Sequence, residues 1–101
     1  MYLVQILLPR ADGEGTPFAP EELDRVKEEL AERFQGVTAY LQAPAEGLWR
    51  NGGKSESDDI LVFEVMIPEV DPADWKRRRL DLERRFRQDT VIIRYLPMSL
   101  V

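Results

Sequence analysis

One segment, residues 60–67, constrains the fold more than any other part of the chain. It reads ILVFEVMI, and Pro68 follows it. β-branched and aromatic residues dominate this segment, and a proline closes it, as expected for a buried strand. Its single charged residue is Glu64. A buried carboxylate without a partner is energetically costly, so the fold must provide Glu64 with a polar neighbour or a ligand.

Apolar runs bounded by breaker residues predict three further strands. They cover residues 2–9, 37–42 and 90–96. Pro44 is expected to stop the second of these strands. Between it and the strand at 60–67 the sequence is irregular, with Asn51-Gly52 as a tight-turn signal. We expect residues 47–59 to form a small protruding β-arm, and a disordered loop is the alternative, since serine and acidic residues fill 55–59.

Two helices are predicted between the strands. The first begins at Pro20, a residue tolerated in a first turn, and Gly36 is placed to end it as a C-terminal cap. The second begins after Asp71, which can cap it, with Pro72 at the first helical position. Each helix carries one apolar stripe at helical spacing. The stripes are Leu23, Val26, Leu30 and Phe34 in the first helix, and Trp75, Leu82 and Phe86 in the second.

The resulting order, β-α-β-β-α-β, predicts an α+β fold of the ferredoxin-like type. Its four-stranded antiparallel sheet would have the order 4-1-3-2, with both helices on one face. The length of 101 residues fits one domain, residues 1–101. No segment approaches the ~20 apolar residues that span a bilayer, and the N-terminal run reads as a strand. We therefore expect a soluble, cytoplasmic protein without a membrane partner.

The chain contains neither cysteine nor histidine. Their absence excludes disulfides, thiolate metal sites, cysteine nucleophiles, Ser-His-Asp triads and most zinc sites. We expect no cofactor and no metal, and no residue is assigned as catalytic. Acid–base chemistry, if present, would depend on Asp, Glu, Tyr or Lys.

The alternation of side chains sorts the strand residues onto two faces. The predicted helix-facing set is Val4, Ile6, Leu8, Val37, Ala39, Leu41, Leu61, Phe63, Val65, Ile67, Val91, Ile93 and Tyr95. The opposite face would carry an apolar patch of Leu3, Leu7, Ile60, Val62, Met66, Ile92 and Leu96. An exposed apolar patch of this kind marks an interface or a ligand groove. We expect a homodimer in which two sheets pack against each other.

A polar residue near the middle of each strand interrupts this second face. In the predicted strand order these residues are Arg94, Gln5, Glu64, and Thr38 or Tyr40. One hypothesis is a structural network that sets strand register and dimer geometry. A second is a small-molecule pocket lined by Gln5, Tyr40, Trp49, Glu64 and Arg94. Trp49 would be a lid of this pocket or part of an arm that embraces a partner subunit, and the alternative is that it covers the edge of the core. A third is a cofactor-independent oxygenase or isomerase with Glu64 as base, Arg94 as anion binder and Tyr40 as donor.

Charge is unevenly distributed along the chain. The net charge is −5, yet residues 76–101 carry 8 basic and 3 acidic residues. The basic residues of the second helix suggest binding of phosphate or nucleic acid. The alternative is a solvated helix face neutralised by the acidic first helix. Because no aromatic residues interleave with the basic ones, we expect nucleic acid not to be the partner.

Three segments resemble small bacterial proteins of unknown function that have the ferredoxin-like fold. They are residues 34–40 (FQGVTAY), residues 44–49 (PAEGLW) and residues 86–88 (FRQ), the last leading into the final strand. The resemblance covers most of the chain. More broadly, the chain is similar to dimeric α+β barrel proteins, which include cofactor-independent monooxygenases, haem-degrading enzymes, isomerases and non-enzymatic binders. This similarity implies a dimer but transfers no activity, and histidine-dependent members do not fit this chain.

Overall fold

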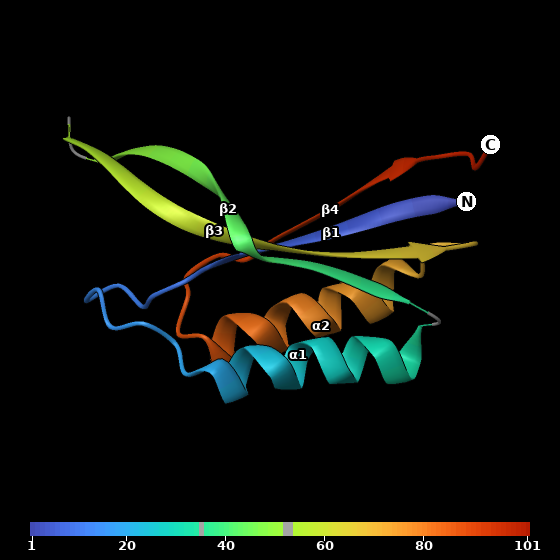
Figure 1. Ribbon diagram of the computed structural model, residues 1–101, viewed down its shortest axis with the longest axis horizontal. Coiled ribbons are helices and arrows are strands. Elements are labelled where there is room, and N and C mark those ends of the chain that lie inside the picture. Colours follow the sequence, from blue (N-terminus) through green and yellow to red (C-terminus); the bar gives the residue numbers. More distant parts are fainter. Residues whose placement is uncertain (35, 52–53) are drawn as a thin grey trace.

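The computed structural model describes the backbone of residues 1–34, 36–51 and 54–101 and the side chains of residues 1–34, 36–38 and 60–101. The elements follow in the order β1 (Tyr2–Pro9), α1 (Pro20–Arg33), β2 (Val37–Asn51), β3 (Lys54–Ile67), α2 (Pro72–Arg85) and β4 (Ile92–Pro97). The helices lie side by side beneath one face of a single sheet (Figure 1). Within the described residues, neither helix is long and apolar enough to cross a membrane.

The sheet has the strand order β2-β3-β1-β4, and every neighbouring pair is antiparallel. This is the predicted order 4-1-3-2 read from the other edge. The two helices on one face complete the α+β ferredoxin-like arrangement. The fold class expected from the sequence is therefore confirmed.

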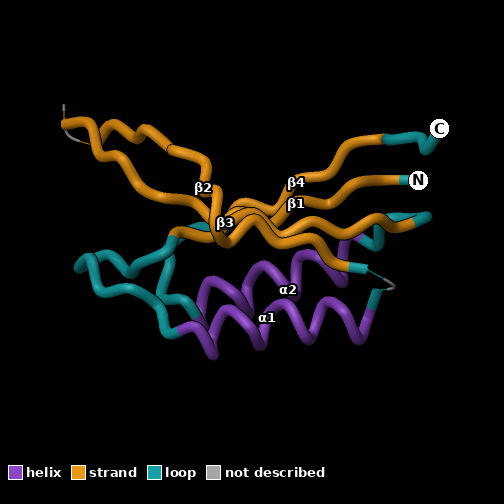
Figure 2. Tube along the Cα trace, in the orientation of Figure 1, coloured by secondary structure: helices purple, strands orange, loops and turns teal. Residues whose placement is uncertain are grey.

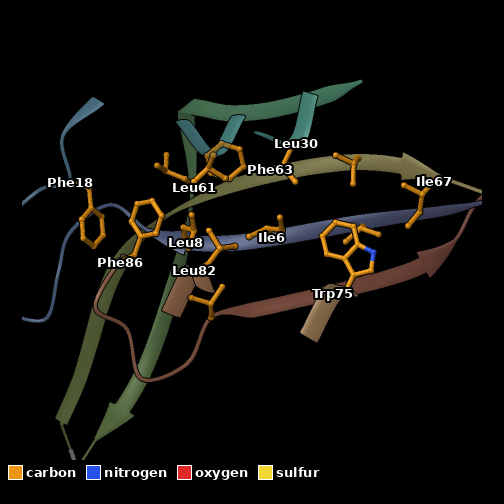
Figure 3. Packing of buried hydrophobic residues seen from close by; sticks show 14 residues of the cluster. Ile6, Leu8, Phe18, Leu30, Leu61, Phe63, Ile67, Trp75, Leu82 and Phe86 are labelled. Atoms are coloured by element: carbon orange, nitrogen blue, oxygen red, sulfur yellow. The ribbon is translucent and has the colours of Figure 1, made fainter. Parts of the chain in front are cut away.

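The core lies between the sheet and the helices (Figure 3). Both helices bury their predicted stripes there, and Trp75 is a core residue as expected. From the sheet, the buried set is Val4, Ile6, Leu8, Leu61, Phe63, Val65 and Ile67, with Val91 just before β4. Val37 and Ile93 pack against this cluster. The side chains of Ala39 and Leu41 lie outside the described residues.

The core contains one residue that the sequence pattern did not indicate. Phe18, at the end of the loop before α1, is buried and meets Phe86 edge-on at a centroid distance of 5.0 Å. A single aromatic residue in a Gly- and Pro-rich loop has no periodicity, so its burial could not be read from spacing. Tyr95 differs in the opposite way, being 55% exposed although it shares the side of Val4. It belongs to an edge strand, and its ring contacts Tyr2 edge-on at 5.8 Å.

Strand β2 is longer than predicted, because Pro44 does not end it. The pairing shifts from Tyr40–Val62 to Ala45–Ile60, so several β2 residues oppose one β3 residue. A proline is tolerated where the ladder is already interrupted. Beyond this bulge, residues 45–51 pair with residues 54–60 and form the predicted β-arm. The arm rises on the side away from the helices (Figure 2).

Ile60 was expected in the exposed patch, but it is buried. It lies where β3 enters the arm, pairing with Pro9 on one side and Ala45 on the other. By the alternation of β3, Ile60 belongs to the face away from the helices, and the arm rises on that same side (Figure 2).

The two helices end differently. The Asp71 carboxylate caps α2 as predicted, accepting hydrogen bonds from the backbone of Ala73 at 3.1 Å and Asp74 at 3.3 Å. The prediction that Gly36 caps α1 is wrong. Phe34 ends that helix in an extended conformation, with φ −122° and ψ 154°. Its ring stacks on Trp75 at 5.3 Å, so a core contact and not a glycine turn defines the exit of α1.

Candidate functional site on the open face of the sheet

The face of the sheet opposite the helices, here called the open face, carries the predicted polar row. Gln5 in β1 pairs in register with Glu64 in β3 and with Arg94 in β4, and Glu64 pairs in turn with Thr38 in β2. The four residues therefore lie across four adjacent strands. Strand pairing alone accounts for this alignment, since side chains of paired residues point to the same side.

Hydrogen bonds join three members of the polar row. Gln5 Nε2 donates to Glu64 Oε2 at 2.6 Å, and Arg94 Nε donates to Gln5 Oε1 at 2.8 Å. A carboxylate only accepts and a guanidinium only donates, so the Gln5 amide has one orientation that satisfies both neighbours. Gln5 thus links the half-buried Glu64 to the exposed Arg94 through one hydrogen bond to each.

Arg94 uses only part of its hydrogen-bonding capacity. Its Nε is bound by Gln5, while among the described residues Nη1 and Nη2 have no hydrogen-bond or ion-pair partner. Those two nitrogens form the planar fork that binds carboxylates and phosphates with two parallel hydrogen bonds. Because the neighbouring amide fixes Nε, the fork is oriented before any ligand or partner arrives.

One apolar row flanks the polar row on each side. The first consists of Leu96, Leu3 and Met66, and the second of Ile92, Leu7 and Val62, each set paired in register across β4, β1 and β3. Met66 is 50% exposed, Leu96 43% and Ile92 38%, and the other three are half-buried. The predicted patch is therefore present, apart from Ile60.

The remaining two predicted site residues stand elsewhere in the register. Tyr40 pairs with Val62, so its backbone continues the second apolar row and not the polar row. Trp49 pairs with Glu56 in the arm, several pairs away from Glu64. The side chains of Tyr40 and Trp49 lie outside the described residues. Their assignment as ligand-binding residues stays a prediction, whereas Thr38 is the β2 residue that aligns with Glu64.

The basic residues of α2 are paired mainly by acids of the same helix. Asp74 binds Arg77 at 2.7 Å and Arg78 at 3.1 Å. Further pairs within the helix join Glu83 to Arg79 and Asp81 to Arg84 and Arg85. These pairs have the i,i+3 and i,i+4 spacing that was present in the sequence. They leave less free positive charge for nucleic acid than the sequence suggested.

A single ion pair in the described part of the chain connects the two helices. Arg85 Nη1 binds Glu29 of α1 at 2.7 Å. Burial lowers the pKa of Arg85, but its hydrogen bonds to Glu29 and Asp81 outweigh this effect and raise the pKa above its ordinary value. At Asp74 the hydrogen bond from Arg77 is the largest influence, and the pKa of that carboxyl lies below its usual value. The expected neutralisation of α2 by α1 thus occurs through Glu29.

Two hollows on the helix layer contain none of the predicted site residues. One of about 360 Å³ is lined by Glu21, Glu22, Arg25, Arg85 and Phe86. Another of about 510 Å³ lies along α2 and is lined by Asp74, Arg77, Arg78, Leu80, Asp81 and Arg84. Both hollows are lined by acidic and basic groups together. Among the described residues, no group of three or more acidic side chains is arranged to hold a metal ion.

Comparison with known proteins gives matches of fold. No protein-family model and no curated protein matches the sequence. Among solved structures, the divalent cation tolerance protein (Cut A1) from Thermus thermophilus has a TM-score of 0.64 and 15% identity, covering 100% of this chain and 87% of that one. The periplasmic divalent cation tolerance protein CutA from Archaeoglobus fulgidus has a TM-score of 0.62 and 17% identity, with coverages of 100% and 87%. A phage SAM lyase solved with S-methyl-5'-thioadenosine has a TM-score of 0.64 and 11% identity, with coverages of 94% and 79%.

These similarities establish the fold and leave the activity open, because one fold supports many functions. They confirm the ferredoxin-like fold that the resemblance of the sequence implied. One of the three proteins is named as periplasmic, and the cytoplasmic location expected for this chain stays a prediction.

Proposed function

We propose that the protein is a homodimeric domain that assembles through the open face of its sheet, with the polar row setting the geometry of assembly. The observation that carries this proposal is the arrangement of the open face. A hydrogen-bonded row crosses its middle, and apolar residues that remain exposed flank the row on both sides. A contiguous apolar surface of this kind favours association.

Burial of the two apolar rows provides the driving force. Removing apolar surface from water contributes about 25 cal/mol per Å². Sheets that pack face to face lie about 10 Å apart, close enough for side chains such as Met66 and Leu96 to interdigitate. A second copy offers a surface of the same shape and composition, which suits a closed, symmetric assembly.

The polar row can enter such an interface without a large penalty. Burying a polar group costs free energy mainly when its hydrogen bonds are lost. Gln5 is bonded at both ends of its amide, and Glu64 accepts a bond from it. Among the three hydrogen-bonded residues of the row, the fork of Arg94 needs an acceptor from outside the described part of the monomer. A partner that covers the open face must therefore provide a hydrogen-bond acceptor for Arg94.

Light scattering coupled to size exclusion tests the proposal directly. We expect a dimer mass at micromolar concentration for the natural chain, and a folded monomer for Met66→Glu. The matched control is Leu80→Glu, because Leu80 is also 50% exposed but lies on α2, on the other layer. This variant should remain dimeric.

A natural chain that is monomeric at these concentrations would refute the dimer. A mass of three or more copies would refute the two-copy assembly, and sensitivity to Met66→Glu would then still identify the open face as the interface.

A second candidate function is the binding of a small anionic molecule at Arg94. It is supported by the Nη1 and Nη2 atoms of that residue, which have no partner among the described residues. Titration with simple carboxylates and phosphates, followed by two-dimensional NMR, should move backbone signals of residues 92–96. The Arg94→Gln variant should abolish these shifts, whereas Arg10→Gln, at an exposed residue outside the sheet, should not.

A further inference from the structure

We infer that the two-fold axis of the proposed dimer runs parallel to the strands, over β1, so that Arg94 of each copy pairs with Glu64 of the partner subunit. This inference rests on the proposed dimer and adds the orientation of its two copies. It also assigns a partner to the fork of Arg94, which has none among the described residues, namely a carboxylate supplied by the second copy.

The charges of the polar row make the open face asymmetric across the strands. Arg94 in β4 and Glu64 in β3 lie on opposite sides of Gln5, each one strand away. Adjacent strands are about 4.8 Å apart, so the positive and negative ends of the row are separated by about 10 Å at the backbone. The row is thus a short dipole perpendicular to the strands, centred on β1.

Two stacked sheets related by a two-fold axis must have that axis in the plane between them. An axis parallel to the strands reverses the row, so each Arg94 faces Glu64 of the partner subunit. An axis perpendicular to the strands leaves the row in the same direction. Arg94 then faces Arg94 of the partner subunit, and Glu64 faces Glu64 of the partner subunit. Like charges juxtaposed in an interface strongly disfavour association, so the first axis is selected.

The apolar rows are compatible with this orientation. With an axis over β1, each apolar row packs against the same row of the partner subunit. Leu96 then faces Met66 of the partner subunit, and Leu3 faces Leu3 of the partner subunit. The other axis would place one apolar row on the other, which is equally apolar. The apolar rows do not discriminate between the two orientations, so the argument for the first axis rests on Arg94 and Glu64.

The hydrogen-bonding capacities of the two groups also agree. Arg94 has Nη1 and Nη2 available beyond the bond from its Nε to Gln5. A carboxylate has about four acceptor positions, so Glu64 can keep the bond from Gln5 and its further interaction within the monomer and still accept another donor. The pair across the interface would complete a closed polar belt of two rows.

Cysteine cross-linking tests the axis, because the natural chain has no cysteine that could interfere. Residues on the axis meet their own copies, so Leu7→Cys alone should cross-link efficiently with a short bis-maleimide. Ile92→Cys alone and Val62→Cys alone should cross-link poorly, since each lies one strand away from the axis. An equimolar mixture of these two variants should cross-link strongly. If Leu7→Cys does not fold, Leu3→Cys occupies an equivalent place on the axis.

The perpendicular axis gives a different cross-linking pattern. It would place Leu7 opposite Leu3 of the partner subunit, so Leu7→Cys would react with Leu3→Cys and not with itself. That pattern in a stable dimer would overturn this inference and leave the proposed dimer intact. If light scattering shows that the natural chain is a monomer, the proposed function is refuted as well.

Charge reversal provides an independent measurement. Arg94→Glu and Glu64→Arg should each raise the dimer dissociation constant by at least about tenfold, since each brings like charges together. The double variant should recover most of the loss. Lys76→Glu and Glu28→Arg change the net charge equally, lie on the helices and should have little effect. Single reversals that leave the dissociation constant unchanged would overturn the pairing.

Discussion

The two faces of the sheet are formed by the same strands but differ in how far their apolar side chains are buried. In β3, Phe63 and Val65 are almost completely buried beneath the helices, whereas Met66 on the other side is half exposed. Both faces are rich in apolar residues. The helix-covered face is completed within the monomer, and the open face is not. The proposed dimer accounts for this difference, because it would cover the apolar residues of the open face.

The charges on the two sides differ in the same way. On the helix layer, arginines such as Arg77 and Arg85 are paired with acids of the same chain. On the open face the hydrogen-bonded row ends in an arginine whose fork has no partner among the described residues. Most arginines of α2 are therefore paired within the chain, whereas Arg94 on the open face keeps two guanidinium nitrogens without a partner among the described residues.

Truncation of one side chain on each face should give the largest contrast. We expect Phe63→Ala to lower the free energy of unfolding by about 3–5 kcal/mol, because it leaves a cavity in the core. Val62→Ala, at the adjacent half-buried position of the open face, should cost less than about 1.5 kcal/mol. Urea denaturation at a protein concentration below the dimer dissociation constant measures the free energy of unfolding of both variants. Equal losses for the two variants would contradict the distinction between the faces.

Removal of the middle member of the polar row should have an intermediate effect. Gln5→Leu leaves both Glu64 and Arg94 without the amide that joins them, and we expect a loss of about 1–3 kcal/mol in monomer stability. In an Arg94→Leu background the same change should cost less, since part of the network is already gone. Strict additivity in this double-mutant cycle would show that the row is not coupled.

Acid should weaken the helix layer through Asp74. The pKa of this carboxyl is lower in the folded state than in the unfolded state, chiefly because of the hydrogen bond from Arg77. Its stabilising contribution is therefore fully present above the unfolded pKa and is lost as the pH falls through the folded pKa. Asp74→Asn should lower stability at neutral pH and have a much smaller effect at strongly acidic pH. Thermal denaturation between neutral and strongly acidic pH measures this, and a pH-independent loss would contradict it.

A change at the start of α1 should have the smallest effect and should leave the open face unaltered. The Glu22 side chain accepts a hydrogen bond from the backbone N–H of Ala19 at 3.2 Å, but alanine has no side-chain acceptor to return. Ala19→Ser completes this capping box and should stabilise the monomer by about 0.5–1 kcal/mol. The same change at Ala31, inside the helix, should destabilise it by about 0.5 kcal/mol. Neither variant should change the dimer dissociation constant.

The polar row was predictable because side chains alternate between the two faces along each strand. Alternation placed Gln5, Glu64 and Arg94 on one face, and the strand order placed them side by side. The choice between Thr38 and Tyr40 was not predictable, because it depends on the exact β2–β3 register. The ion pairs inside α2 were present in the sequence as i,i+3 and i,i+4 spacings, but the acidic first helix suggested a different source of neutralisation.

Alone, the sequence determined the order of the elements, the sides to which strand residues point and the capping of α2 by Asp71. These properties depend on local periodicity and on residues that lie close together in the chain. Tertiary structure decided the burial of Phe18 and Ile60 and the continuation of β2 past Pro44. It also decided the two hydrogen bonds by which Gln5 joins Arg94 and Glu64. Each of these depends on contacts between segments far apart in the chain, whose exact register and bending local sequence does not specify.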